Sequence, residues 1–204
     1  MASNYYTEVI SIVRKPLHIK HDKLKQVVVD FQNLSQHADV FEVSDVYICL
    51  GTTIKKAKSK GAFKKVDLNY PTEIAKLAHM KGAKRLAVIS ALGANEDSNF
   101  FYNRVKGKME QAIESVPFKG TYIFRPSLLL GSRNEFRFGE RMGIAANEIF
   151  KHVMLGSLSK YKGIKAEKVA QAMFMVTTAK KKGLHYFESN EIRKMTKKAL
   201  ERRA

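Results

Sequence analysis

Tyr102 and Lys106 stand four residues apart in the segment SNFFYNRVKGKMEQ, which covers residues 98–111. On a helix this spacing places both side chains on one face. A tyrosine phenol has a reference pKa of about 10, but a nearby ammonium group favours the phenolate and lowers that pKa. Such a pair can pass a proton to or from a substrate oxygen. The spacing therefore predicts an acid–base unit, with Tyr102 exchanging the proton.

Composition weakens this signal, because 27 of the 204 residues are lysine and a second pair, Tyr161 and Lys165, has the same spacing. The sequence context separates the two pairs. Tyr102 follows Ser90, a hydroxyl that closes an apolar run and could hold the same substrate oxygen. Tyr161 lies in the polar stretch SLSKYKGIK and is interpreted as an ordinary surface residue.

Short β-branched runs alternate with segments of helical periodicity along the chain, and several of the runs are apolar at consecutive positions, as in strands buried on both faces. Strands are predicted over residues 9–13, 27–29, 46–50, 85–90, 121–124 and 184–187. Helices are predicted over 71–82, 101–115, 138–153, 166–179 and 191–203, with Asn190 as a cap and Gly82 as a stop. The stretch GTTIKKAKSKGAFKK (51–65) is predicted to be a loop. Strand–helix alternation predicts βαβ units and a parallel sheet covered on both faces, in a single domain over 1–204.

Ligands of such sheets bind at the carboxyl ends of the strands, so the residues that follow each predicted strand are candidates for a site. Taken singly, each of them could simply end a strand or permit a turn. Together they form a set of small, polar and basic groups of the kind that surrounds a nucleotide. The set comprises Arg14, Lys15, Asp30, Gly51, Thr52, Thr53, Ser90, Arg125, Pro126 and Ser127.

The formal charge of +18 has two interpretations, a polyanion partner or a solvated lysine-rich surface. Lysines outnumber arginines 27 to 10 and are scattered, whereas base readout favours arginine, so nucleic-acid binding is the less favoured alternative. One cysteine, Cys49, and the lack of a secretory pattern predict a reduced, cytoplasmic setting. No apolar run approaches a membrane span, and the six histidines lack ligand spacing, so neither a membrane nor a metal site is expected.

The stretches ISALGANEDSNFFYNRVKGKMEQAI, TYIFRPSLLLGSRNEFRFGE and CLGTTIKKA resemble the atypical short-chain dehydrogenase/reductases, specifically the branch of Tat-interacting-protein-like oxidoreductases. The resemblance runs from about Tyr5 to Met195 and implies a Rossmann-like doubly wound parallel sheet that binds NAD(P). It implies that Ser90 orients the substrate carbonyl, Tyr102 is the general acid–base, and Lys106 holds the nicotinamide ribose. The positions it assigns to the cofactor are Arg14, Leu50, Gly51, Thr52 and Pro126, with Arg14 favouring NADP. Lys15 and Asp30, which follow predicted strands, are expected to bind the cofactor as well.

Two departures from this family qualify the resemblance. Ala91 stands where a second serine is common in the family, so Ser90 alone would provide the hydroxyl that orients the substrate carbonyl. No glycines have GxGxxG or GxxGxxG spacing, and the start of the chain resembles the end of the family's first helix. The family's first strand and helix, with their glycine-rich phosphate turn, are therefore expected to be missing. The sequence leaves open whether the chain is truncated, another segment or subunit fills the gap, or redox activity has been lost.

Three functions compete at this level. The leading hypothesis is an NADP- or NAD-dependent oxidoreductase that transfers hydride to or from a small carbonyl or alcohol substrate. The second is a non-catalytic regulatory or protein-interaction module on the same scaffold, and the third is a basic polyanion binder. Loops at Ser132–Gly143 and near Tyr161 are expected to shape a substrate pocket, and exposed strand edges would favour a homo-oligomer.

Overall fold

A computed structural model describes residues 3–130 and 162–201 of the chain. Its strands are β1 (Val9–Val13), β2 (Leu24–Val28), β3 (Asp45–Ile48), β4 (Arg85–Ile89), β5 (Gly120–Arg125), β6 (Leu129–Leu130), β7 (Ile164–Lys165) and β8 (Gly183–Glu188). Its helices are η1 (Phe31–Phe41), α1 (Ile54–Ala57), α2 (Lys60–Lys64), η2 (Lys65–Asn69), α3 (Tyr70–Met80), α4 (Phe101–Glu114), α6 (Ala166–Thr178) and α7 (Ser189–Glu201).

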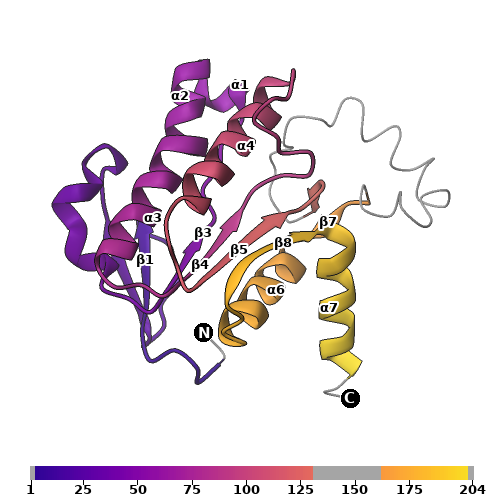
Figure 1. Ribbon diagram of the computed structural model, residues 1–204. Coiled ribbons are helices and arrows are strands. Elements are labelled where there is room, and N and C mark those ends of the chain that lie inside the picture. Colours follow the sequence, from indigo (N-terminus) through magenta and orange to yellow (C-terminus); the bar gives the residue numbers. More distant parts are fainter. Residues whose placement is uncertain (1–2, 131–161, 202–204) are drawn as a thin grey trace.

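The main sheet has four strands in the order β3-β4-β5-β8, and all its neighbouring strands are parallel. In β5, all residues but the last are buried, which is the consecutive burial that the apolar sequence TYIF predicts. Helices cover both faces: α3 and α4 lie on one side of the sheet, and α6 and α7 lie on the other (Figure 1). This arrangement confirms the predicted α/β class, a Rossmann-like parallel sheet wound on both sides.

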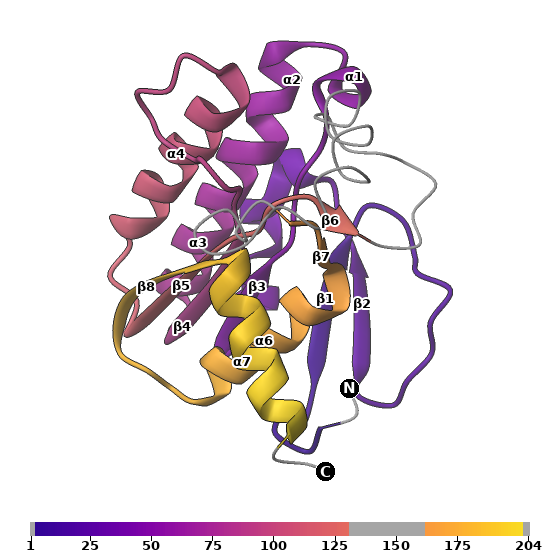
Figure 2. The same ribbon diagram turned by 90° about the vertical axis from the view of Figure 1, so that its right-hand side faces the viewer.

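A second, two-stranded parallel sheet consists of β1 and β2 and stands beside the β3 end of the main sheet (Figure 2). Among the described residues, no strand pairs with the free edges of β1 and β3. The Tyr6 side chain, just before β1, connects the two sheets, because its hydroxyl lies 2.7 Å from both Asp45 Oδ2 and the Tyr47 hydroxyl of β3. In a doubly wound sheet of order 3-2-1-4-5-6, this break falls at the position of strand 1.

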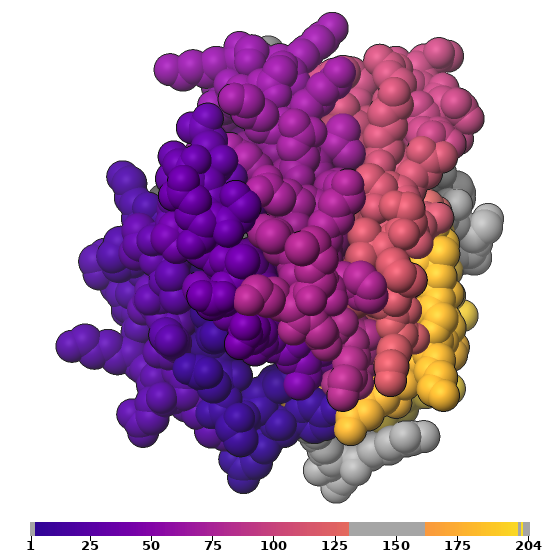
Figure 3. Space-filling view, turned by 60° about the vertical axis from the view of Figure 1, so that its left-hand side comes forward, coloured from indigo at the N-terminus to yellow at the C-terminus, as the bar shows by residue number. Residues whose placement is uncertain are grey.

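The hydrophobic core has two parts, one on each face of the main sheet. On the α3–α4 face, Leu86 and Val88 of β4 pack with Ile113 of α4, and Ile12 of β1 extends this cluster into the smaller sheet. On the α6–α7 face, Tyr122, Phe124, Met173 and Ile192 are among the buried members of the second cluster. In space-filling view, the N-terminal part of the chain, in indigo, lies directly against the purple part that follows it in the sequence (Figure 3).

Three predictions about individual elements need correction or fall outside the description. The stretch 51–65 is not a loop: it contains α1 and α2, each begun by a hydroxyl cap, Thr53 or Ser59. Lysine-rich helix turns were missed because their apolar positions are few. The second strand lies at Leu24–Val28, earlier than the predicted 27–29. The predicted helix 138–153 lies outside the described residues.

Helix ends follow the sequence more closely. Gly82 has φ +89° and its N–H donates to the His79 carbonyl at 3.0 Å, so it ends α3 in the left-handed conformation that glycine tolerates best. Within residues 3–130 and 162–201, no helix combines the length and apolar character needed to cross a bilayer.

The phenols of five tyrosines are expected to ionise at higher pH in the folded protein than in the unfolded chain. Their pKa values are raised, with burial as the largest cause for Tyr6, Tyr47, Tyr70, Tyr122 and Tyr186. A raised folded-state pKa stabilises the fold below the unfolded pKa of about 10, and that contribution is lost as pH rises above it. Absorbance titration of tyrosinate should therefore give a late-ionising fraction that disappears in denaturant; ionisation of all tyrosines near pH 10 would contradict this assignment.

Candidate functional site

The residues predicted to surround a nucleotide lie along one edge, because parallel strands direct their carboxyl ends the same way. Arg14 follows β1, Asp30 closely follows β2, and Thr52 lies in the loop after β3. Ser90 follows β4 directly, and Pro126 follows β5. Thr52, Ser90 and Pro126 thus follow strands of the main sheet, and Arg14 and Asp30 follow strands of the smaller sheet. In doubly wound folds, ligands bind at such carboxyl ends.

At the β1–β2 end of this edge, the predicted adenosine-side residues gather around Tyr70. Arg14 and Lys15 are exposed, while Asp30 caps η1 by accepting from the Gln32 N–H at 3.0 Å. Burial raises the pKa of the Tyr70 phenol, the carboxylate of Asp30 raises it further, and the guanidinium of Arg14 opposes the shift. Asp30 has a structural role as a cap in addition to its predicted one.

The loops after β4 and β5 are fastened to each other around Ser90. The Ser90 N–H donates to the Phe124 carbonyl at 2.7 Å, and the Leu92 N–H donates to the Pro126 carbonyl at 3.0 Å. The side chain of Ser90 is 4% exposed, and its Oγ has no hydrogen-bond partner in the described part of the chain. A buried hydroxyl without a partner is unusual in a folded protein and calls for an explanation.

Helix α4 carries Tyr102 and Lys106 one turn apart on the same face, as predicted. The Tyr102 ring is half-buried against Phe63 of α2, with 5.8 Å between ring centroids. Lys106 is 3% exposed, and its Nζ lies 2.8 Å from Oδ1 of Asp67, which is itself 1% exposed. The ammonium of Lys106 is therefore held by a buried carboxylate and does not point into solvent.

The loop that carries Ser90 into α4 is pressed against that helix. Gly93 adopts φ +78° beside Asn103, and the Asn95 N–H donates to the Asn103 carbonyl at 3.1 Å. A Cβ on Gly107 would lie only 2.2 Å from the backbone nitrogen of Glu96. Glycine in this helix therefore permits a close approach of the loop's backbone that no other residue allows.

Replacing Gly107 with alanine is expected to lower the free energy of unfolding by about 1–3 kcal/mol, since the contacts are backbone atoms that cannot rotate away. The matched control is Gly61→Ala in α2, where the new Cβ would meet only Ser59 Oγ at 3.9 Å. There the greater helix propensity of alanine should stabilise by up to about 1 kcal/mol. Urea unfolding of both variants measures the difference, and equal stability changes would refute the close packing at Gly107.

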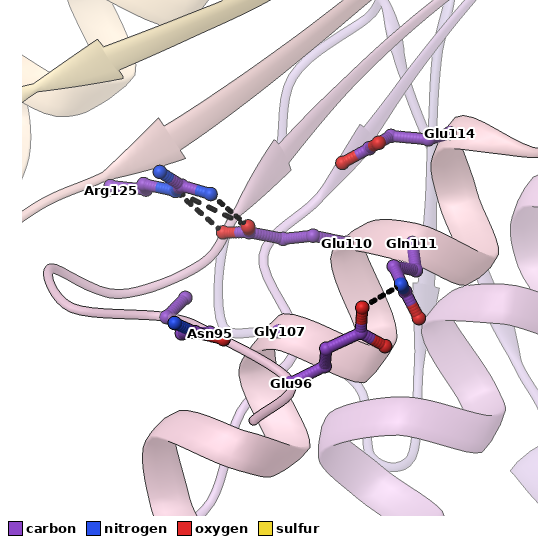
Figure 4. A pocket seen from close by; sticks show the side chains of 8 residues that line it. Asn95, Glu96, Gly107, Glu110, Gln111, Glu114 and Arg125 are labelled. Carbon is purple, nitrogen blue, oxygen red and sulfur yellow. Dashed lines mark hydrogen bonds and ion pairs between the residues drawn. The ribbon is translucent and has the colours of Figure 1, made fainter. Parts of the chain in front are cut away.

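A cavity of about 310 Å³ lies on a neighbouring face of α4, lined by Ala94, Asn95, Glu96, Gly107, Glu110, Gln111, Glu114 and Arg125. Arg125 and the buried Glu110 point toward one another across it, with Arg125 Nε 3.0 Å from Glu110 Oε1 (Figure 4). Ser90, Tyr102 and Lys106 do not line this cavity. Within its lining, Arg125 pairs with Glu110 and Gln111 with Glu96. Of the candidate residues that follow predicted strands, the cavity shares Arg125.

Asp67 thus links Lys106 to the loop after β3, because its carboxylate contacts both Lys106 and Thr52. Ser90 and Pro126 lie on neighbouring segments that are joined by the backbone hydrogen bonds from Ser90 to Phe124 and from Leu92 to Pro126. Ser90 Oγ makes no hydrogen bond to Tyr102 or Lys106 within residues 3–130 and 162–201. The pocket loop predicted at Ser132–Gly143 and the segment at Tyr161 lie outside the described residues. The described residues hold no group of three or more His, Cys, Asp or Glu side chains arranged for a metal ion.

Asp67 was missed from the sequence, although a signal for it exists. Read as one helix, residues 60–80 have a buried stripe that includes Phe63, Pro71, Ile74 and Ala78, and Asp67 falls on it at helical spacing. A carboxylate on an apolar stripe requires a charged or hydrogen-bonding partner, since carboxylates are almost never buried unless paired. The signal was hidden because residues 51–65 were interpreted as a loop.

Comparison with known proteins finds sequence relatives that extend beyond this chain. Protein HTATIP2 of Rattus norvegicus is 38% identical over 144 residues, which is 69% of this chain and 59% of that protein. Protein FMP52, mitochondrial, of Debaryomyces hansenii is 35% identical over 154 residues, 73% of this chain and 64% of that protein. The chain spans less than two thirds of the length of these relatives. No protein-family model matches it.

The predicted cytoplasmic location is corrected by the fungal relatives, whose names describe them as mitochondrial proteins in Candida albicans, Debaryomyces hansenii and Scheffersomyces stipitis. The prediction relied on a single cysteine and an uninformative N-terminus. One unpaired cysteine is compatible with any reducing compartment, so composition could not separate the cytosol from an organelle.

Solved structures similar to this chain share its fold, among them two that contain NAD. MoeE5 in complex with UDP-glucose and NAD has a TM-score of 0.65 and 12% identity, covering 94% of this chain and 73% of that one. WbmH of Bordetella bronchiseptica in complex with NAD+ has a TM-score of 0.62 and 14% identity, covering 89% and 67%. At such identities the likeness shows the fold alone. The chain is therefore similar in sequence to HTATIP2 and FMP52, and its fold is the Rossmann-like α/β fold seen in NAD complexes.

Proposed function

We propose that this chain binds NAD(P) at the carboxyl edge of its sheet and belongs to an oxidoreductase of the short-chain dehydrogenase/reductase type. The observation that carries the proposal is the Ser90 hydroxyl, which is buried at the end of β4 and has no partner among the described residues. A substrate carbonyl or alcohol oxygen would supply the missing partner. The NAD-complexed proteins of the same fold support the choice of cofactor.

The residues divide into three roles in this proposal. Ser90 donates a hydrogen bond to the substrate oxygen and orients it. Tyr102 gives a proton to that oxygen during carbonyl reduction and takes one during alcohol oxidation. Lys106 contributes positive charge beside Tyr102. A bound nicotinamide would supply the hydride chemistry at the substrate carbon, and Tyr102 would handle the one proton that accompanies each hydride.

The dinucleotide would lie along the edge from β1 to β5. Arg14 and Lys15 are exposed and basic, which suits a phosphate on the adenosine ribose and favours NADP. The loop Leu50–Thr52 would approach the middle of the cofactor, Asp30 its adenosine side, and Pro126 its nicotinamide end. The described residues lack the glycine-rich turn that usually cradles the pyrophosphate, so weak binding by this chain alone is expected.

The proposal is tested by calorimetric titration of the chain with NADPH and with NADH. We expect measurable binding, tighter for NADPH, and we expect Arg14→Ala to weaken NADPH binding while leaving NADH binding unchanged. Absence of binding for both nucleotides at millimolar concentration would refute the proposed function for this chain. If Arg14→Ala binds NADPH as tightly as the wild type does, only the role of Arg14 is refuted.

A non-catalytic module on the same scaffold is the second candidate, and the buried Lys106–Asp67 ion pair favours it. An ammonium already held by a carboxylate at 2.8 Å is less available to a cofactor hydroxyl. A module of this kind would keep nucleotide binding, or binding to a protein partner, without turnover. Tyr102→Phe separates the two functions, because an enzyme would lose turnover whereas a non-catalytic module would have none to lose.

A further inference from the structure

Asp67 lies at the junction of three elements. It belongs to η2, a π-helical turn that continues α2 directly into α3, since the junction residues Lys65 and Tyr70 both have right-handed helical dihedral angles. Single π-helical turns within longer helices occur frequently at functional sites. The turn carries Asp67 on its inner side, where the carboxylate is 1% exposed.

Both oxygens of the carboxylate are used, and they contact different elements. Oδ1 lies 2.8 Å from the Nζ of Lys106 on α4. Oδ2 accepts a hydrogen bond of 2.8 Å from the backbone N–H of Thr52, in the loop after β3. One side chain therefore connects a predicted cofactor loop to a predicted catalytic lysine.

The chemistry of the two partners specifies an ionised carboxylate. A backbone N–H and a lysine ammonium are both donors, so the group between them must accept on both sides. An asparagine of the same shape has one acceptor oxygen and one NH₂ group. It could satisfy Thr52 or Lys106, but its NH₂ would then face the other donor.

We propose that Asp67 is a positioning residue: its carboxylate fixes the loop at Thr52 and the ammonium of Lys106 relative to each other, and nucleotide affinity depends on this link. The second half of the proposal rests on the proposed function. Because the two contacts share one carboxylate, a change at Lys106 should be felt at Thr52, which Lys106 does not contact in the described residues. Coupling of this kind is reciprocal, so a ligand on the loop should also shift Lys106.

The first test measures hydrogen exchange of the Thr52 amide by NMR without any nucleotide. We expect Asp67→Asn to speed exchange by about tenfold or more, the factor that corresponds to loss of a hydrogen bond to a charged group. Lys106→Met should also speed it, because the freed carboxylate can reorient. The double variant Asp67→Asn with Lys106→Met should recover protection, since the introduced amide can then turn its oxygen to Thr52.

The matched control is Glu73→Gln, which removes one carboxylate from the same helical stretch where the described residues give it no ion pair. Its Thr52 exchange should equal that of the wild type, and amides of β4 and β5 report whether each variant is folded. If Asp67→Asn does not fold, Lys106→Met and the double variant carry the test. Unchanged Thr52 exchange in Lys106→Met, or no recovery in the double variant, would overturn the coupling.

The second test titrates the same variants with NADPH and NADH in the calorimeter. About tenfold weaker binding by Asp67→Asn, with Glu73→Gln unchanged, supports the link to nucleotide affinity. Binding by the wild type and by Asp67→Asn with equal affinity overturns that link and leaves the proposed function standing. If the wild type does not bind, the proposed function and the link to affinity fail, whereas Thr52 exchange still decides whether Asp67 couples the loop to Lys106.

Discussion

Asp67→Asn is expected to lower the free energy of unfolding by about 3–5 kcal/mol, the cost of leaving one partner of a buried ion pair without its counter-charge. Lys106 and Asp67 are 3% and 1% exposed, so water cannot replace the lost partner. Lys106→Met should cost a similar amount, because it leaves the Asp67 carboxylate buried without its counter-charge. Urea unfolding followed by circular dichroism measures both values.

The double variant distinguishes an ion-pair effect from simple disruption of packing. Removing both charges should cost less than the sum of the single substitutions, because neither group then remains as an unpaired buried charge. The surface pair of Lys197 and Glu201, 3.7 Å apart and largely exposed, provides the control. Glu201→Gln should change stability by less than about 0.5 kcal/mol. A cost below about 1 kcal/mol for Asp67→Asn would mean that the buried pair does not form in solution.

Tyr102→Phe is expected to lower kcat by about 10²- to 10⁴-fold, the contribution that a positioned acid–base group makes to proton transfer. The change removes one hydroxyl and keeps the ring, so packing against Phe63 should persist. The affinity for NADPH should therefore remain near that of the wild type. Turnover of a panel of aldehydes and ketones, followed by loss of NADPH absorbance, measures kcat, and calorimetry measures the affinity.

Tyr5→Phe is the matched control for loss of a phenol hydroxyl. Tyr5 is 40% exposed, precedes β1, and lies near the opposite end of the strands from the candidate site. Its substitution should leave kcat unchanged. Wild-type turnover that survives Tyr102→Phe would remove Tyr102 from the mechanism. Nucleotide binding without turnover of any substrate in the wild type would instead favour the non-catalytic module.

The sequence by itself determined the strands of the main sheet and the helices α3 and α4, but not the short helices α1 and α2. Consecutive apolar residues at 121–124 specified a strand buried on both faces, and Gly82 specified where α3 ends. These features can be predicted without distant contacts, because backbone preferences and the spacing of apolar residues depend only on residues a few positions apart. The same reasoning placed Arg14, Ser90 and Pro126 at the carboxyl ends of parallel strands, where the structure has them.

Only the tertiary structure decided how those residues are used. The sequence treated Lys106 as a free cation beside Tyr102, whereas the fold buries its ammonium against Asp67, which is 39 residues earlier in the chain. It offered no hint that Gly107 admits the backbone of Glu96 or that Asp67 also holds Thr52. These contacts join segments far apart in sequence, and their energies come from desolvation and close packing, which exist only once the sheet and helices have assembled.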